Sequence, residues 1–193
     1  MSGFIFYFKI GWSHIISTSA TDHLYFIAVL SILYQLADWK KVLVLVTAFT
    51  IGHAITLYLS ALDLFRVSVE WVEFVIPCTI VITAAKNLLM PTQTEAGNKI
   101  QYAMALGFGL VHGMGYANYI RMMLSSDQQL VGSLFSFNIG LEIGQIFVVL
   151  VVLFISWNLL RFNVISHRML VMLFSLIVMG LSLFMAYQRI PFF

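Results

Sequence analysis

Charged residues are rare in this chain of 193 residues. Asp, Glu, Lys and Arg make up 9% of it, whereas about 25% is usual for a soluble domain. This composition excludes a fold that presents a charged surface to water, and the net charge of +2 is too small to indicate a nucleic-acid partner. Cysteine is nearly absent as well, and the single Cys78 excludes an internal disulfide.

Apolar residues take the place of the missing charge. They form 61% of the chain, and the mean hydropathy is +0.97. Their runs are too long and continuous for the strands of a membrane barrel, so we predict an all-α integral membrane protein embedded in the lipid bilayer. Residues 1–193 are expected to form a single transmembrane domain, a bundle of six helices. The candidate spans are residues 21–37, 41–62, 70–89, 100–124, 133–160 and 169–188.

The segment before the first span is apolar and aromatic but is interrupted by Lys9 and Gly11. It has neither a basic start nor a small-residue cleavage signature, so we do not expect a removable signal peptide. The prediction for this N-terminal segment is a short interfacial helix that lies on the membrane surface.

Basic residues fall unevenly on the two sides of the predicted membrane. Because cytoplasmic loops carry an excess of Lys and Arg, we predict a multi-pass protein of the cell inner (plasma) membrane with both termini outside the cytoplasm. The richer side holds Lys40, Lys41, Lys86, Lys99, Arg161 and Arg168, and the other holds Lys9, Arg66, Arg121 and Arg189.

Ionisable residues of separate spans share one depth. His53, His112 and Glu73 each lie thirteen residues along a helix from a basic residue at the predicted inner boundary. This separation corresponds to ~20 Å, which is the outer half of a hydrocarbon core about 30 Å thick. The other ionisable residues that we place near this level are Asp22 and His23 at the mouth of the first span, and Glu142 in the fifth.

A shared site is the simplest way to accommodate these groups. Each intramembrane acid costs roughly 2–3 kcal/mol unless it is paired or hydrated. Taken singly, a histidine can merely join two helices, Glu73 can reach interfacial water, and Asp22 can cap the first span. Without a shared site, all of these separate interpretations would have to be true at once for residues at the same depth. A single shared site is the simpler explanation. His167 lies in a basic loop, and we assign it no function.

Glycine spacing indicates how the helices approach. The stretches GLVHG and GLEIG place glycines four residues apart around His112 and Glu142, a spacing that lets helix backbones pack closely. Along the fifth span Asn138, Glu142 and Gln145 follow i, i+4 and i+7 spacing and line one face. A face so polar is predicted to point into the bundle.

Imidazoles and carboxylates without a thiolate favour a divalent transition metal, such as Ni, Co, Zn, Mn or Fe(II), over Cu(I). Ligand type alone leaves the choice among these metals open.

Five stretches in order, HIISTSATDHLYF, AFTIGHAITL, VEFVIPCTI, GFGLVHGMGYA and FNIGLEIGQ, resemble the successive blocks of the HupE/UreJ membrane proteins. The resemblance implies a helical membrane protein linked with nickel or cobalt uptake, of a family whose members accompany hydrogenase or urease genes. In the nickel-permease branch a proline follows the first histidine, whereas Ile15 stands here, so the chain resembles a divergent branch. The candidate metal ligands that the resemblance implies are His14, Asp22, His23, His53, Glu73, His112 and Glu142.

Transport of a divalent metal ion of the nickel or cobalt type is the predicted function. A carrier needs a polar route beyond its site, and Thr79, Thr83 and Asn87 share one face of the third span. One alternative is an intramembrane zinc-dependent hydrolase that acts on a lipid or membrane substrate, with three protein ligands and a metal-bound water. The other is a structural metal held by a closed shell of four ligands. The oligomeric state is not predicted.

Overall fold

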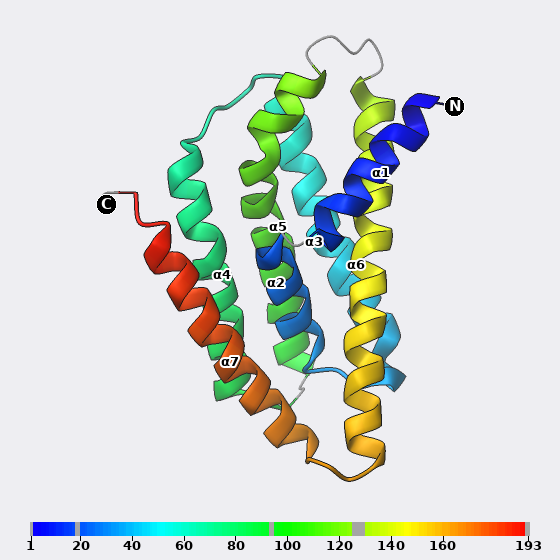
Figure 1. Cartoon of the computed structure of the whole chain (residues 1–193), viewed down its shortest axis with the longest axis vertical. Coiled ribbons are helices and arrows are strands. Elements are labelled where there is room, and N and C mark those ends of the chain that lie inside the picture. The colour runs from blue at the N-terminus through cyan, green and yellow to red at the C-terminus, as the bar shows by residue number, and fades with distance from the viewer. Residues whose placement is uncertain (1, 18–19, 93–94, 125–129, 192–193) are drawn as a thin grey trace.

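The structure, a computed structural model, describes residues 2–17, 20–92, 95–124 and 130–191. Within these residues every regular element is helical, which confirms the all-α part of the predicted fold class, whereas the count of six spans stays a prediction. Seven α-helices and one short 3-10 turn form an elongated bundle (Figure 1). They are α1 (Ser2–Ile16), α2 (Thr21–Ser31), η1 (Leu36–Asp38), α3 (Trp39–Ala61), α4 (Val69–Leu89), α5 (Glu95–Leu124), α6 (Leu130–Arg161) and α7 (His167–Gln188).

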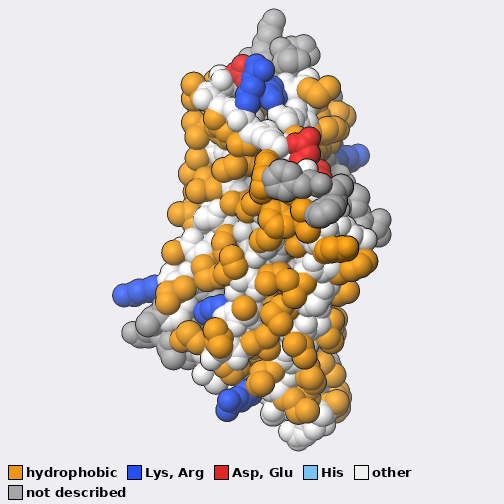
Figure 2. Space-filling view, turned by 90° about the vertical axis from the view of Figure 1, so that its left-hand side faces the viewer, with side chains coloured by type: hydrophobic (Ala, Val, Ile, Leu, Met, Phe, Trp, Pro, Cys, Tyr) orange, Lys and Arg blue, Asp and Glu red, His pale blue; other side chains and the backbone are white. Residues whose placement is uncertain are grey.

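Four of the described helices are long and apolar enough to cross a membrane. They are α4, α6, α7 and α3 together with the turn before it. Hydrophobic side chains cover most of the face shown in Figure 2, and charged ones are few there. These features fit a membrane protein. α5 is longer than α3 or α4, but it is more polar and falls outside this group.

The first predicted span, residues 21–37, is wrong in its extent. α2 ends at Ser31 after 11 residues, a length of ~16 Å that cannot cross a bilayer alone. Ile32, Leu33 and Tyr34 follow it as buried non-helical chain. Hydropathy counts such residues as part of a span because it depends on how apolar the side chains are and not on the backbone conformation.

The prediction of an N-terminal helix on the membrane surface is also wrong. α1 packs along α6, with Gly11 of α1 against the backbone of α6, so it belongs to the bundle. It runs inward from the upper end of Figure 1, and α2 continues toward the lower end. The two short helices therefore extend one after the other along the bundle, with a break between Ile16 and Thr21.

Glycine brings the helices of two pairs into backbone contact. Between α3 and α5, a Cβ atom on Gly52 would overlap the carbonyl oxygen of Leu106, and one on Gly109 would overlap that of Phe49. We call this contact the α3–α5 seam. The close approach that the spacing of glycines in GLVHG predicted is thus made with α3.

The second pair is α1 with α6. A Cβ atom on Gly11 would overlap the carbonyl oxygen of Phe137, and one on Gly140 would overlap that of Phe8. We call this contact the α1–α6 seam. α4 packs mainly with α7, and the short α2 contacts α4, α6 and α7. The main helix pairs are thus α3 with α5, α1 with α6 and α4 with α7.

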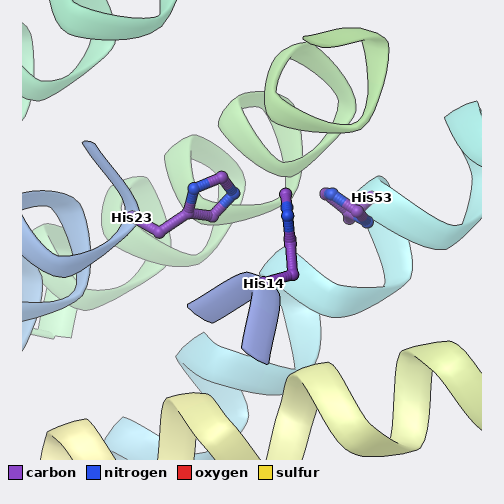
Figure 3. Close-up of side chains that lie close together, drawn as sticks. All are labelled: His14, His23 and His53. Carbon is purple, nitrogen blue, oxygen red and sulfur yellow. The ribbon is translucent and has the colours of Figure 1, made fainter. Parts of the chain in front are cut away.

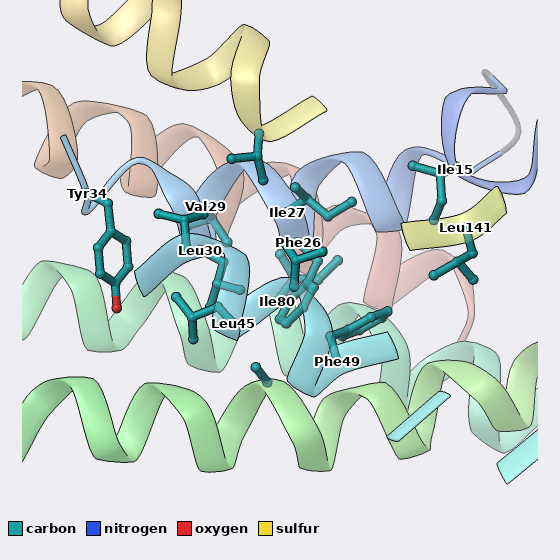
Figure 4. Packing of buried hydrophobic residues seen from close by; sticks show 14 of the residues in the cluster. Ile15, Phe26, Ile27, Val29, Leu30, Tyr34, Leu45, Phe49, Ile80 and Leu141 are labelled. Carbon is teal, nitrogen blue, oxygen red and sulfur yellow. The ribbon is translucent and has the colours of Figure 1, made fainter. Parts of the chain in front are cut away.

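Apolar side chains fill the bundle on the lower side of this break. Phe26 of α2, Phe49 of α3 and Ile80 of α4 are almost fully buried and lie close together (Figure 4). The ring centroids of Phe26 and Phe49 are 5.0 Å apart. These side chains form the floor under the candidate site.

Candidate metal site

Four histidines from four different helices meet beside the break. His14 lies in the last turn of α1 and His23 in the first turn of α2, and α3 and α5 supply His53 and His112. The ring centroid of His23 lies 4.7 Å from that of His14 and 5.0 Å from that of His112. His14 lies 5.9 Å from His53 on the same measure. His53 is eight residues from the upper end of α3, or ~12 Å along the helix axis, so the cluster belongs to the upper half.

Three of the four rings converge on a common point. One ring nitrogen from each of His14, His23 and His53 lies within 4.8 Å of the others, and Figure 3 shows the three side chains pointing toward one another. Nitrogens bound to one tetrahedral ion are about 3.4 Å apart. The ring nitrogens therefore need to approach one another by at most about 1.4 Å to bind a metal together.

Most nitrogens of this four-histidine cluster have no hydrogen-bond partner within the described part of the chain. Buried polar atoms are nearly always hydrogen-bonded, because an unpaired one costs about 1–3 kcal/mol. A group of them in one place is the donor set that a metal ion would satisfy. The unpartnered atoms are Nε2 of His14, Nε2 of His23, both ring nitrogens of His53 and Nδ1 of His112.

Asp22 sets the tautomer of His23. Its Oδ1 lies 3.0 Å from Nδ1 of His23 and also accepts the backbone N–H of that residue at 2.9 Å. With the ring proton held on Nδ1, Nε2 of His23 carries the free lone pair. A carboxylate behind an imidazole is the usual arrangement around a bound metal, where it orients the ring and raises its basicity.

Thr79 of α4 plays the corresponding part for His112. Its hydroxyl donates to the carbonyl oxygen of Ile76 at 2.6 Å, so its Oγ1 can only accept from Nε2–H of His112, 3.3 Å away. Nδ1 of His112 then carries the free lone pair. Two of the four rings are thus held in a defined tautomer.

Aromatic side chains hold the remaining two rings. His53 is fully buried between Phe49 and Phe137, with a ring centroid 6.2 Å from each and near-parallel planes. The ring centroid of Tyr116 lies 4.1 Å from that of His14. Tyr116 follows the GLVHG stretch at the next turn of α5, and nothing in its spacing distinguished it from an ordinary core residue.

The break also brings two helix ends to the site. The C-terminal end of α1 carries partial negative charge from unpaired carbonyls, and this end favours a cation beside His14. The N-terminal end of α2 carries partial positive charge, and Asp22 in its first turn offsets that charge. The polarity around the cluster is therefore suited to a cation.

A cavity of about 200 Å³ opens on the cluster. His14, Asp22, His23 and His112 line it, and so does Glu73, whose side chain is exposed. Arg189, just after the end of α7, also lines the cavity. Its Nη1 lies 3.4 Å from Oδ2 of Asp22. Glu73 thus stands near the mouth of the cavity and outside the group of converging imidazoles.

Comparison with known families matches residues 1–189 to the family described as HupE / UreJ protein. The match extends over nearly the whole chain. The chain belongs to the HupE/UreJ family. No curated protein and no solved structure matched it. The family is associated with nickel and cobalt transport or with accessory functions.

In this HupE/UreJ protein the polar face of α6 points into the bundle and follows α3. Asn138 lies next to His53. Thr50 donates to Oε1 of Gln145 at 3.1 Å, and Thr47 donates to Oε1 of Glu142 at 2.6 Å. Thr47 precedes His53 by six residues, or ~9 Å along α3. The structure thus places Asn138 beside the cluster and Glu142 below it.

The residues proposed from the sequence as an inner route are closely packed. Thr79, Thr83 and Asn87 are all buried on α4. Thr83 donates to the carbonyl oxygen of Thr79, and Nδ2 of Asn87 donates to that of Val29 at 2.7 Å. A void of only about 10 Å³ lies beyond Phe26 and Phe49. The cavity therefore reaches the histidines from above and is closed below them.

Proposed function

We propose that this chain is a membrane carrier for a divalent transition-metal ion of the nickel or cobalt type, which binds at the four-histidine cluster. The observation that carries the proposal is the convergence of imidazole nitrogens that have no hydrogen-bond partner among the described residues, beside a cavity that His14 and His23 line and His53 lies behind. An imidazole-rich set of this kind suits a borderline metal ion better than Mg²⁺ or Ca²⁺. Family membership points the same way.

The proposal assigns distinct roles to the residues implied by the sequence. His14, His23, His53 and His112 bind the ion, Asp22 orients His23, and Glu73 attracts cations to the cavity. Asn138 supports His53, whereas Glu142 and Gln145 join α6 to α3 through threonines. Zinc fits the same donor set, so selectivity among Ni, Co and Zn depends on geometry.

The proposed arrangement in the membrane has six crossings, of which α1 and α2 share one. The site then lies in the outer half of a cell inner membrane, and both termini lie outside the cytoplasm. The larger number of basic residues at the lower end of the bundle supports this orientation, because positive residues favour the cytoplasmic side.

Transport requires the floor of the site to open. The ring centroids of Phe26 and Phe49 lie 5.3 and 5.1 Å from that of His112, so an ion leaving downward must displace these rings. Thr79 and Thr83 offer the next oxygen atoms along α4. The observed packing corresponds to a carrier that is open above and closed below.

Uptake into proteoliposomes tests the proposal. We expect vesicles containing the protein to accumulate Ni²⁺ or Co²⁺, detected by a chelating dye inside, and the double variant His53→Leu, His112→Leu to lose this uptake. The matched control is His167→Gln, because His167 lies at the start of α7, apart from the cluster. Equal uptake by wild type and the folded double variant would disprove the assignment.

A zinc-dependent hydrolase for a membrane lipid is the second candidate. It is favoured by an apolar groove of about 620 Å³ between α4 and α5, lined by Val75, Met104 and the same Thr79 that contacts His112. An acyl chain in this groove would lie one side chain away from the site. Release of a fluorescent fatty acid from a micellar ester by the zinc-loaded protein, dependent on His53 and without metal uptake, would favour this candidate over the carrier.

A further inference from the structure

Arg189 brings a positive charge to the mouth of a site that the preceding argument assigns to a cation. It follows α7 near the C-terminal end of the chain, 167 residues from Asp22, and reaches the cavity beside it. The side chain of Asp22 is 13% exposed and that of Arg189 is 28% exposed, so their ion pair is partly shielded from water. Partial burial reduces the screening of this pair by salt.

The two oxygens of Asp22 have different partners. Oδ1 holds the ring of His23, and Oδ2 faces the guanidinium group of Arg189 at 3.4 Å. A carboxylate that shares its charge with an arginine passes less of it to the imidazole that it orients, which makes that imidazole a weaker ligand. The guanidinium group also repels a dication in the same cavity. Both effects weaken binding at the four-histidine cluster.

We propose that Arg189 is a positioning residue that lowers the metal affinity of the four-histidine cluster through Asp22 and so promotes release of the ion. The inference rests on the proposed metal site and concerns its regulation. A carrier whose site bound too tightly would retain its ion. The guanidinium group of Arg189 competes with the ion for the charge of Asp22 and so limits the affinity of the site. Glu73, the other acid that lines the cavity, keeps the mouth attractive to cations while Asp22 is paired.

The test is titration of the purified, chelator-stripped full chain with Ni²⁺, followed by metal release into excess chelator. We expect Arg189→Gln to bind Ni²⁺ about tenfold more tightly and to release it correspondingly more slowly. Arg189→Lys keeps the charge and should remain within about twofold of wild type. The matched control is Arg168→Gln, which removes the same charge from an exposed residue at the opposite end of α7 and should leave affinity unchanged.

A double-mutant cycle separates this role from a structural one. In the Asp22→Asn background the further change Arg189→Gln should tighten binding by much less than tenfold, because the effect through Asp22 is gone and only the direct repulsion of the ion remains. If Arg189 only anchored the end of α7, Arg189→Gln would weaken binding in both backgrounds, and that result overturns the inference. Arg189→Met provides a second neutral variant if Arg189→Gln does not fold.

The two proposals fail in different ways. A wild-type protein that binds none of Ni²⁺, Co²⁺ and Zn²⁺ overturns both the metal site and the role of Arg189. A wild-type protein that binds metal, with Arg189→Gln unchanged or weaker in affinity, overturns the role of Arg189 and leaves the site intact.

Discussion

Around His53 the buried ring nitrogens face one another without hydrogen-bond partners, whereas toward the lower end the buried amide of Asn87 is bonded to the carbonyl oxygen of Val29. Near Asn87, Lys86 donates to Gln101 and Tyr34 donates to Asn98. The upper half of the bundle thus gathers several unpaired ring nitrogens in one cluster, whereas in the lower half Asn87, Lys86 and Tyr34 donate to neighbouring oxygens and only single atoms, such as Oδ1 of Asn87 and Nε2 of Gln101, lack a partner among the described residues. This difference is what a binding site above a closed floor requires.

The two halves are also held together by different means. Backbone contacts at glycine are concentrated near the site, where the α3–α5 seam lies next to His53 and His112. A Cβ atom on Gly113 would lie 2.7 Å from the carbonyl oxygen of His53. Such contacts fix backbone positions without using the imidazole nitrogens. In the lower half, side-chain hydrogen bonds join the helices.

The largest effect is expected from filling the α3–α5 seam. Gly52→Ala places a methyl group inside the backbone of α5 and should lower stability by about 3 kcal/mol or more. The control Gly107→Ala lies in the same helix pair with open space around its Cβ position, and its better helix propensity should keep stability unchanged or slightly raised. Thermal unfolding of both variants in detergent measures the change in stability. Equal unfolding temperatures for the two variants would show that the close contact at Gly52 does not stabilise the fold.

Removing one proposed ligand tests the upper half directly. His53→Leu should weaken Ni²⁺ binding by at least about 100-fold, because loss of a ligand exceeds the usual effect of losing an outer partner. In metal-free protein the same change should cost no stability and should raise it by up to about 1 kcal/mol, since two unpaired buried nitrogens are removed. Isothermal titration and thermal unfolding in chelator measure the two quantities. A large loss of metal-free stability would show that His53 is an ordinary structural residue.

The corresponding change in the lower half should have the opposite sign. Asn87→Leu removes the donor to the carbonyl oxygen of Val29 and should lower metal-free stability by about 1–2 kcal/mol. Metal affinity should stay close to that of wild type. If Asn87→Leu and His53→Leu shift the unfolding temperature equally, the proposed contrast between the halves is wrong.

Glu142 provides a smaller test of where the site ends. Its carboxylate accepts from Thr47, and a glutamine side chain at this position would keep an oxygen acceptor there. We therefore expect Glu142→Gln to change Ni²⁺ affinity by less than about twofold, against the 10–100-fold usual for a partner of a ligand. Abolished binding in a folded Glu142→Gln protein would instead assign Glu142 to the ion.

The smallest effect is expected at the exposed loop above the site. Hydrogen bonds from Arg66, and from Arg121 of α5, lower the pKa of Asp63 from 3.8 to about 2. Because the pKa is depressed, the stabilisation is complete above about pH 4 and is lost as the pH falls toward 2. Asp63→Asn keeps a residue that tolerates the positive φ of 55° at this position. It should lower the unfolding temperature slightly at pH 7 and not at pH 2, and an equal shift at both values would contradict the ion-pair explanation.

Counting residues from the ends of the helices predicted that the histidines of separate helices lie at one depth in the upper half. His53 and His112 sit thirteen residues from basic residues, and in straight helices of similar tilt such counts convert directly into depth. The same counting failed for Glu142 because α6 has 32 residues, more than a bilayer requires, so its register relative to the membrane was not fixed.

Other features had no signal in the sequence. Hydropathy could not separate the buried chain after α2 from a continuous helix, nor could it show that Gly11 brings α1 against α6. The pair of Asp22 with Arg189 joins opposite ends of the chain, and no local pattern predicts such a contact. Thr79 was predicted as part of a pathway, and only the three-dimensional arrangement shows its contact with His112.

The two glycine seams place three of the four proposed ligands on two helix pairs. His14 moves with α6, because α1 is packed backbone to backbone against that helix, whereas His53 and His112 move together on α3 and α5. A small rotation of one pair against the other would therefore stretch the distance from His14 to His53 and leave that from His53 to His112 unchanged. The distances between a bound metal ion and these histidines would then depend on how the two helix pairs are placed. A bound ion would hold the two pairs together.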